Sequence, residues 1–234
     1  MQNHPIRLVQ VSKVYDTKFV ETHALTNLNL EIAKGDFVSI SGPSGCGKST
    51  LLSILGLLDQ PTSGQYFIDG TDVSSLSFDQ SATIRNEKIG FVFQSFNLID
   101  ELTVFDNVAL PLRYSSKSRT EQEIAALVNA SLETVDMQHR KDHFPNQLSG
   151  GQQQRVAIAR GIVHQPSILL VDEPTGNLDS KSGEAVMQLL QDLNAKGATI
   201  CMVTHDPHFA EVAKVRLKLQ DGAISKPAEM ECVA

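Results

Sequence analysis

Hydrophobic and polar positions change their period several times along this chain of 234 residues. The stretch 6–15, IRLVQVSKVY, alternates apolar and polar residues and predicts a half-exposed strand. The run 35–42, GDFVSISG, predicts a short strand that enters a glycine-rich turn. The run 66–73, YFIDGTDV, predicts a hairpin that turns at Asp69-Gly70. Together these patterns predict a partly antiparallel β region near the N-terminus.

The middle of the chain, roughly 79–146, has a more helical pattern. Apolar residues recur at helical spacing over 120–135, where Thr120 and Glu123 form a capping box that predicts the start of a helix. The middle therefore predicts a mainly helical region between two parts of a β-containing fold.

The last third returns to strands. The runs 167–174, SILLVDEP, and 198–205, ATICMVTH, are continuously apolar before a polar end, which is typical of strands buried on both faces of a parallel sheet. Between them, 184–197 predicts a helix closed by Gly197. The stretch 216–225, RLKLQDGAIS, alternates around Asp221-Gly222 and predicts a second hairpin.

Composition limits the location and the partners of the chain. The net charge is −7 and Lys and Arg form no block, so we expect no nucleic-acid partner. The cysteines, Cys46, Cys201 and Cys232, match no disulfide or metal pattern and favour a reducing compartment. The N-terminus lacks the apolar segment of a signal peptide, and the longest apolar run, 51–58, falls short of the ~20 residues that span a bilayer. We expect a cytoplasmic chain that can still dock on a membrane protein.

The stretch 42–50, GPSGCGKST, matches the phosphate-binding pattern G-x-x-x-x-G-K-[ST] between an apolar strand and an apolar helix. Its glycines allow a tight turn that points N–H groups at phosphate oxygens, and the helix N-terminus adds its positive dipole end. Lys48 can reach the β- and γ-phosphates, and the Ser49 hydroxyl can bind Mg²⁺. The residues expected to hold the nucleotide are Gly42, Pro43, Ser44, Gly45, Cys46, Gly47, Lys48, Ser49 and Thr50.

Two carboxylates end the predicted strand ILLVD. In a doubly wound sheet this end opens onto the ligand crevice, so Asp172 is placed to hold Mg²⁺, usually through water. Glu173, one residue later, is placed to accept a proton from attacking water. The alternative is a charged strand end that faces solvent.

The order of these elements predicts an α/β fold: a P-loop NTPase with a doubly wound, mainly parallel sheet, an N-terminal antiparallel β region and an inserted α-helical subdomain. We expect one ATPase domain over 1–225. Its core would cover about 1–85 and 165–225, the helical subdomain about 86–164, and a tail would follow over 226–234.

A second glycine-rich stretch, 148–152, LSGGQ, precedes the amphipathic run QQRVAIAR. It could be a simple turn. However, Gly150 and Gly151 expose backbone N–H groups, Ser149 adds a hydroxyl that can also cap the helix, and the helix supplies its dipole, so the local physics predicts an anion site. One ATP needs one phosphate loop, and the chain already has one at 42–50. A second cradle is explained if it serves the ATP of another copy of the chain.

With these motifs in this order, the chain resembles the ATP-binding subunit of an ABC transporter over about 6–224, and LSGGQ is the most specific of the shared motifs. The resemblance implies ATP hydrolysis with ATP and Mg²⁺. It also implies a head-to-tail dimer in which Ser149, Gly150, Gly151 and Gln152 contact the γ-phosphate held by the other copy. Glu173 would be the base, and Lys48 would stabilise charge on the transferred phosphoryl group.

The resemblance assigns four further positions. Tyr15 matches the aromatic that stacks on adenine, with a surface tyrosine as the alternative. Gln94 matches the glutamine that touches Mg²⁺ and the attacking water, next to the place where a permease docks. Asp179 matches the aspartate that links the two nucleotide sites, and it could also cap the following helix. His205 matches the switch histidine that contacts the γ-phosphate.

The phrases FVFQSFNLI, LTVFDNVALPL and VDEPTGNLDS make the chain similar to the macrolide-export and lipoprotein-release branch of the family. This branch implies export or mechanotransmission through an integral-membrane permease, with the chain on the cytoplasmic face of the inner membrane. The permease would dock near Gln94. Within 91–103 we expect Phe91 and Phe93 in the core, and Phe96, Leu98 and Ile99 in an exposed apolar patch.

Three other classes of protein compete with this interpretation. A soluble ABC ATPase of DNA repair or translation usually has two ATPase domains or a long coiled coil, and neither pattern is visible. A role in cell division or envelope maintenance, signalling through a membrane partner, would use the same motor and stays open. A small-molecule kinase or GTPase would lack LSGGQ, and no N-K-x-D guanine motif is visible.

Overall fold

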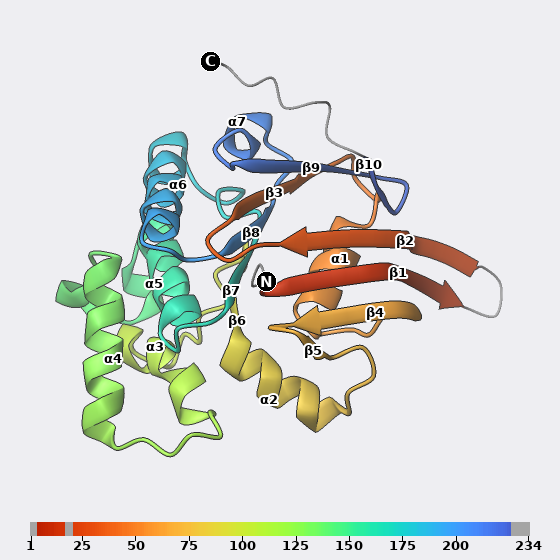
Figure 1. Ribbon diagram of the computed structural model, residues 1–234. Helices are drawn as coiled ribbons and strands as arrows, with labels where there is room; N and C mark the ends of the chain where they lie inside the picture. The colour runs from red at the N-terminus through yellow and green to blue at the C-terminus, as the bar shows by residue number, and fades with distance from the viewer. Residues whose placement is uncertain (1–3, 17–20, 226–234) are drawn as a thin grey trace.

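The computed structural model describes residues 4–16 and 21–225, so the predicted tail at 226–234 lies outside the described residues. Two sheets and the helices around them make up the described part (Figure 1). The strands are β1 (Ile6–Asp16), β2 (Glu21–Ile32), β3 (Phe37–Ser41), β4 (Ser63–Ile68), β5 (Thr71–Asp72), β6 (Ile89–Val92), β7 (Ile168–Asp172), β8 (Ile200–Val203), β9 (Val215–Gln220) and β10 (Ala223–Ser225). The α-helices are α1 (Lys48–Leu55), α2 (Phe78–Lys88), α3 (Val104–Arg113), α4 (Glu121–Thr134), α5 (Gly150–Ile162), α6 (Ser180–Ala195) and α7 (Pro207–Ala210).

The larger sheet has the order β10-β9-β3-β8-β7-β6, and its strands from β9 to β6 are parallel. The smaller sheet, β2-β1-β4-β5, is antiparallel. This arrangement confirms the predicted α/β class with an N-terminal antiparallel region. Both predicted hairpin turns are also present, because Asp69-Gly70 and Asp221-Gly222 have positive φ at both positions.

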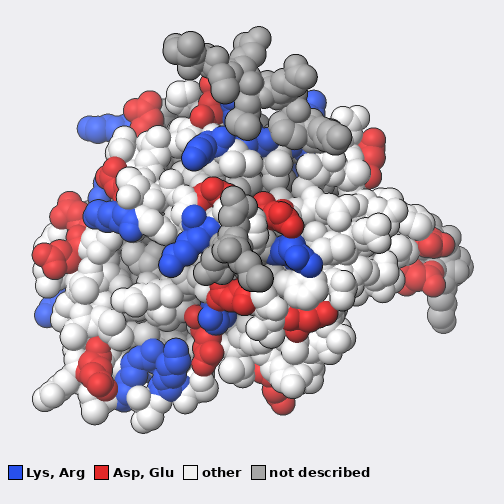
Figure 2. Space-filling model, in the orientation of Figure 1, with Lys and Arg blue, Asp and Glu red and all other residues white. Residues whose placement is uncertain are grey.

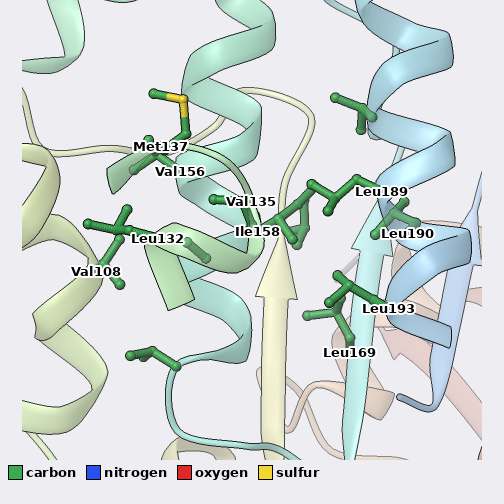
Figure 3. Packing of buried hydrophobic residues seen from close by; sticks show 14 of the residues in the cluster. Val108, Leu132, Val135, Met137, Val156, Ile158, Leu169, Leu189, Leu190 and Leu193 are labelled. Carbon is green, nitrogen blue, oxygen red and sulfur yellow. The ribbon is translucent and has the colours of Figure 1, made fainter. Parts of the chain in front are cut away.

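Apolar side chains of the parallel strands pack in two hydrophobic clusters, one on each face of the larger sheet. Ile40 and Leu170 pack with α1 and the antiparallel sheet on one face. Val171 and Met202 pack on the other face with residues of α3, α4, α5 and α6, which Figure 3 shows from close by. This two-sided burial explains why the predicted strands are continuously apolar.

One part of the predicted domain division is wrong. Ile89–Val92, which lies inside the range 86–164 assigned to the helical subdomain, is strand β6 and pairs in parallel with β7. The helices α2 and α5 pack on it, so this short segment is a strand of the core sheet. Its four residues are too few to reveal their period within a helical stretch. The long antiparallel strand β2 was also not predicted.

Helix ends follow the capping residues. Thr120 accepts a hydrogen bond from the Glu123 N–H, and the Glu123 carboxylate accepts one from the Thr120 N–H, so the predicted capping box is confirmed. Gly197, with φ of 99°, follows α6 at the predicted position. No helix in the described ranges has both the length and the apolar character needed to cross a membrane.

The hydroxyl of Tyr66, in β4, donates a 2.6 Å hydrogen bond to the carbonyl of Leu55 at the end of α1. Tyr66 is fully buried, and burial raises the pKa of its phenol well above the usual range. This bond ties the antiparallel sheet to the helix that begins at the phosphate loop.

We predict that Tyr66→Phe lowers the free energy of unfolding by about 1 to 2 kcal/mol, because the buried Leu55 carbonyl loses its partner. Urea denaturation followed by circular dichroism measures the change. Tyr114→Phe is the control, since Tyr114 is 80% exposed and should change stability by less than ~0.5 kcal/mol. Equal effects of the two substitutions would contradict the assignment.

Candidate functional site

The register of the parallel strands aligns the ends of four neighbours at one edge of the larger sheet. Val92 of β6 lies opposite Val171 of β7, and Asp172 of β7 lies opposite Val203 of β8. Val203 in turn lies opposite Ile40 of β3. The chain therefore leaves all four strands at nearly the same level, which is where ligands bind in open α/β sheets.

Four predicted site segments begin at this edge. The loop 42–50 follows β3, and Glu173 follows β7 directly. His205 and Gln94 each come two residues after the end of their strands, β8 and β6. The structure thus brings together four segments that are spread over more than 160 residues of sequence.

The phosphate loop leaves donors open at the start of α1. Gly47 is the N-cap residue with φ of 104°, and it carries no capping side chain. The first N–H groups of α1, from Lys48 to Thr50, therefore have no intrahelical acceptor and are available to an anion. A Cβ atom at Gly47 would lie 2.4 Å from the Ala24 carbonyl oxygen, so both conformation and packing require glycine there.

The side chains of Lys48 and Cys46 meet in the loop, with the Lys48 ammonium 3.9 Å from the Cys46 sulfur. The Lys48 ammonium donates to the carbonyls of Gly42 and Pro43, both at 2.8 Å, so it lies inside the loop where a phosphate would bind. Cys46 is only 5% exposed and its side chain packs in the cluster that contains α1. Burial therefore leaves little of the Cys46 side chain for contact with a nucleotide.

The environment of Asp172 fits a cation. Burial and the neighbouring Glu173 charge raise the pKa of the Asp172 carboxyl, while Lys48 acts in the opposite direction. The carboxylates of Asp172 and Glu173 are thus close together in a partly buried site, and the Lys48 ammonium does not fully compensate their negative charge. A divalent cation bound to phosphates and to the hydroxyl of Ser49 suits this arrangement of oxygen donors.

Glu173 has an unusual backbone and a close partner. Its φ is +45°, in the left-handed region that non-glycine residues rarely adopt, so the chain turns sharply after β7. Its carboxylate lies 2.5 Å from Nδ1 of His205. The Glu173 side chain is 16% exposed and that of His205 is 69% exposed, so the imidazole can present its other nitrogen to a ligand.

Gln94 makes a contact that was not predicted. Its side-chain amide lies 3.4 Å from Oδ1 of Asn177, and the Asn177 amide donates to the Gln94 carbonyl at 3.0 Å. A Cβ atom at Gly176 would lie 2.6 Å from the Gln94 amide nitrogen, so glycine there allows this approach. Asn177 stands in the stretch GNLDS, two residues before the predicted site residue Asp179. Nothing in the sequence indicated that Asn177 would contact Gln94.

The LSGGQ stretch forms a capping box at the start of α5. The Ser149 hydroxyl accepts from the Gln152 N–H at 3.3 Å, and the Gln152 side chain accepts from the Ser149 N–H at 3.0 Å. The predicted cap is confirmed. The hydroxyl proton of Ser149 and the N–H groups of Gly150 and Gly151 have no role in this box and are available to an anion.

The two glycines also pack against the segment around Asp179. A Cβ atom at Gly150 would lie 3.3 Å from Leu178, and one at Gly151 would lie 3.0 Å from Ser182. Asp179 caps α6 by accepting hydrogen bonds from the hydroxyl and the N–H of Ser182, which lower the pKa of the Asp179 carboxyl. The cradle therefore adjoins the start of α6 in its own chain. Asp179 also caps α6, which is the alternative role predicted for it.

Tyr15 lies near the end of β1, in the antiparallel sheet. The residue is 41% exposed, and its hydroxyl donates to Asp59 at 2.9 Å. The Lys13 ammonium lies 4.9 Å from the ring centroid and pairs with Asp59 at 2.6 Å. Contacts with Lys13 and Asp59 therefore hold the Tyr15 side chain in place, while part of it faces solvent.

A groove of about 740 Å³ lies between α2, α3, α5 and β6. The stacked rings of Phe91 and Phe93 line it. Phe91 also packs against the cluster that contains α1, as predicted, whereas Phe93 is partly buried and packs against neither cluster. Conversely, Leu98 packs against the helical cluster, and Ile99 is 44% exposed. The sequence did not show which side chains of 91–99 are buried, because strand β6 ends at Val92 and the strand periodicity stops there.

Charged side chains do not form a large patch of one sign on the face shown in Figure 2, where acidic and basic groups are interspersed.

Comparisons with known proteins agree with this geometry. Residues 25–176 match the ABC transporter family. An uncharacterized ABC transporter ATP-binding protein of Methanocaldococcus jannaschii, MJ1508, is 49% identical over 94% of this chain and 97% of its own length. The macrolide export ATP-binding/permease protein MacB of Syntrophobacter fumaroxidans is 46% identical over 94% of this chain, but the match spans 31% of MacB.

The solved structures include the dimeric ATP-binding cassette MJ0796 in a post-hydrolysis state bound to ADP and Pi. It is 46% identical, with a TM-score of 0.85, over 94% of this chain and 97% of that chain. Since both the family match and the relatives cover most of the sequence, the chain belongs to the ABC transporter family, as an ATP-binding and ATP-hydrolysing motor subunit.

Proposed function

We propose that two copies of this chain close head to tail around two Mg·ATP and drive an integral-membrane permease. The observation that carries the proposal is the presence of two separate anion cradles, one at 42–50 and one at 149–152, each at a helix N-terminus with open donors. The MJ0796 cassette, which is dimeric and bound to ADP and Pi, supports the dimer in this proposal.

In this proposal each residue has a defined task. The loop 42–50 and Lys48 bind the phosphates, Ser49 and Asp172 hold Mg²⁺ together with Gln94, and Tyr15 stacks on adenine. Mg²⁺ neutralises phosphate charge when it is bound. Ser149, Gly150, Gly151 and Gln152 contact the γ-phosphate held by the other copy, next to Asp179.

Hydrolysis would depend on Glu173 and His205. Glu173 accepts the proton of the attacking water, and its 2.5 Å contact with Nδ1 of His205 fixes the direction of both side chains. The second nitrogen of His205, with Lys48, stabilises charge on the transferred phosphoryl group. Loss of phosphate would then remove the link between the two copies and open the dimer.

The permease would dock in the groove between α2, α3 and α5. Its lining is rich in apolar side chains, including Phe91 and Phe93, and the exposed residues Leu58 and Tyr114 lie on it. Gln94 follows Phe93 directly, so an occupant would lie close to the hydrolysis site. The MacB relatives, named as export ATP-binding/permease proteins, favour an export or mechanotransmission role on the cytoplasmic face of the membrane.

The central test is Glu173→Gln, which keeps the size of the side chain and removes the base. We expect a stable dimer at saturating Mg·ATP and a kcat at least ~100-fold lower than that of the unsubstituted chain. Analytical ultracentrifugation measures the dimer, and phosphate release measures kcat. A variant that stays monomeric at saturating Mg·ATP would exclude the sandwich.

Ser149→Ala tests the second cradle. We expect kcat to fall about 100-fold while the affinity of the monomer for ATP stays nearly constant, since the cradle serves the nucleotide of the other copy. The substitution also removes a helix cap worth ~1 kcal/mol.

Ser77→Ala is the matched control, because Ser77 and Gln80 form the same Ser-Gln capping box at α2, also with a 3.3 Å bond. It should lower stability to a similar extent and leave kcat unchanged. Loss of ATP affinity in Ser149→Ala would instead indicate that the cradle acts on its own chain's nucleotide.

The raised pKa of Asp172 predicts a gain in stability on substitution. A carboxyl whose pKa is higher in the folded chain than in the unfolded chain destabilises the fold where it is ionised, and this effect vanishes as pH falls through the folded pKa. Asp172→Asn should therefore raise the free energy of unfolding at pH 7 without nucleotide, and the gain should shrink on acidification.

Urea denaturation between pH 4 and 7 measures the effect. Asp59→Asn is the control of opposite sign: burial raises the pKa of Asp59, but hydrogen bonds from Lys13 and Tyr15 outweigh it and lower the pKa. That substitution should lower stability at pH 7. An Asp172→Asn chain that is less stable at pH 7 would refute the prediction.

A further inference from the structure

Arg160, in the last turn of α5, is a partly buried cation paired with backbone carbonyls. It donates to the carbonyl of Phe96 at 2.7 Å and to the carbonyl of Asn97. Within 4–16 and 21–225 no carboxylate forms an ion pair with it. Burial lowers the pKa of its guanidinium to about 10, so it stays protonated at neutral pH. Its charge is therefore compensated by two carbonyl dipoles.

The backbone that Arg160 holds is strained. Phe96 and Asn97 have φ of 58° and 51°, two consecutive left-handed residues, neither of which is glycine. Each costs about 1 kcal/mol or more relative to an ordinary conformation. Two charge-assisted hydrogen bonds to the carbonyls of this turn can offset such a cost. Without them the turn would relax toward conformations with negative φ.

This turn lies between two parts of the proposed site. Its Phe96 ring is 3.6 Å from the place that a Cβ atom at Gly150 would occupy, so it contacts the LSGGQ cradle. Gln94 lies two residues before it and contacts Asn177. Asn97 and Arg160 also line the groove proposed for the permease. Arg160 is on the same helix as the cradle. Its side chain therefore connects the C-terminal end of α5 to the turn that adjoins the cradle, Gln94 and the groove.

We infer that Arg160 is a positioning residue: it holds the turn at Phe96 and Asn97 so that Gln94 and the LSGGQ cradle keep one relative geometry as two copies close. Arg160 lies on the groove and is not one of the residues proposed to bind nucleotide. A docked permease segment would reach it directly, and any shift of the turn would move Gln94 and the cradle together. This inference rests on the proposed ATP-dependent dimer.

The test compares two arginines of the same helix. Arg160→Met keeps the length and apolar stem of the side chain but removes its donors, whereas Arg160→Lys keeps the charge and part of the donor capacity. The matched control is Arg155→Met. Arg155 donates to the carbonyl of Val135, at the end of α4, instead of to the turn at Phe96 and Asn97.

We expect Arg160→Met to lower kcat about tenfold, with an ATP affinity of the monomer within about twofold of the unsubstituted chain. In the Glu173→Gln background, about tenfold more Mg·ATP should be needed for half-maximal dimerisation. Arg160→Lys should restore part of both. Arg155→Met should lower the free energy of unfolding to a similar extent and leave kcat within about twofold.

A second variant separates positioning from packing. Asn97→Gly removes the left-handed strain at one residue, so Arg160→Met with Asn97→Gly should recover part of kcat without restoring the buried contacts of Arg160. Equal losses of kcat in Arg160→Met and Arg155→Met, or unchanged kcat and dimerisation in Arg160→Met, would overturn the inference while leaving the dimer intact. If Glu173→Gln alone stays monomeric, the proposed function fails instead.

Discussion

The parallel register of β6, β7, β8 and β3 is the constraint on which the rest of the site depends. Because these strands run in the same direction and end at one level, four short segments separated by long stretches of sequence begin at one edge. Burial of both faces of the sheet fixes that register, since a shift by one residue would exchange the side chains of the two hydrophobic clusters. Packing of the core therefore sets the geometry of the chemistry.

Local patterns predicted most of the fold. The phosphate loop, the capping box of Thr120 and Glu123, and the Asp221-Gly222 hairpin each depend on a few adjacent residues, so their chemistry is visible in the sequence. Strand β6 was assigned to the helical region because four residues carry no clear period, and its burial depends on α2 and α5. The antiparallel sheet was predicted in part, without β2.

The candidate site residues were predictable in identity but not in contacts. Gly151 was assigned to phosphate, yet it also allows close packing on Ser182, more than 30 residues later. Cys46 stands in the phosphate loop, but its side chain is buried in the core. Arg160 carries no motif signal of its own because its partners are carbonyl oxygens, which every residue has. Such contacts depend on tertiary structure, which a single sequence does not display.

The left-handed backbone of Glu173 has a consequence for protein engineering. Glycine would adopt this conformation with less strain, by roughly 1 kcal/mol or more, so selection for heat resistance alone favours losing the carboxylate. Folding and turnover thus make opposite demands on one position. Directed evolution of a thermostable form of this chain should therefore score ATP turnover in every round, since survival of the fold does not report survival of the base.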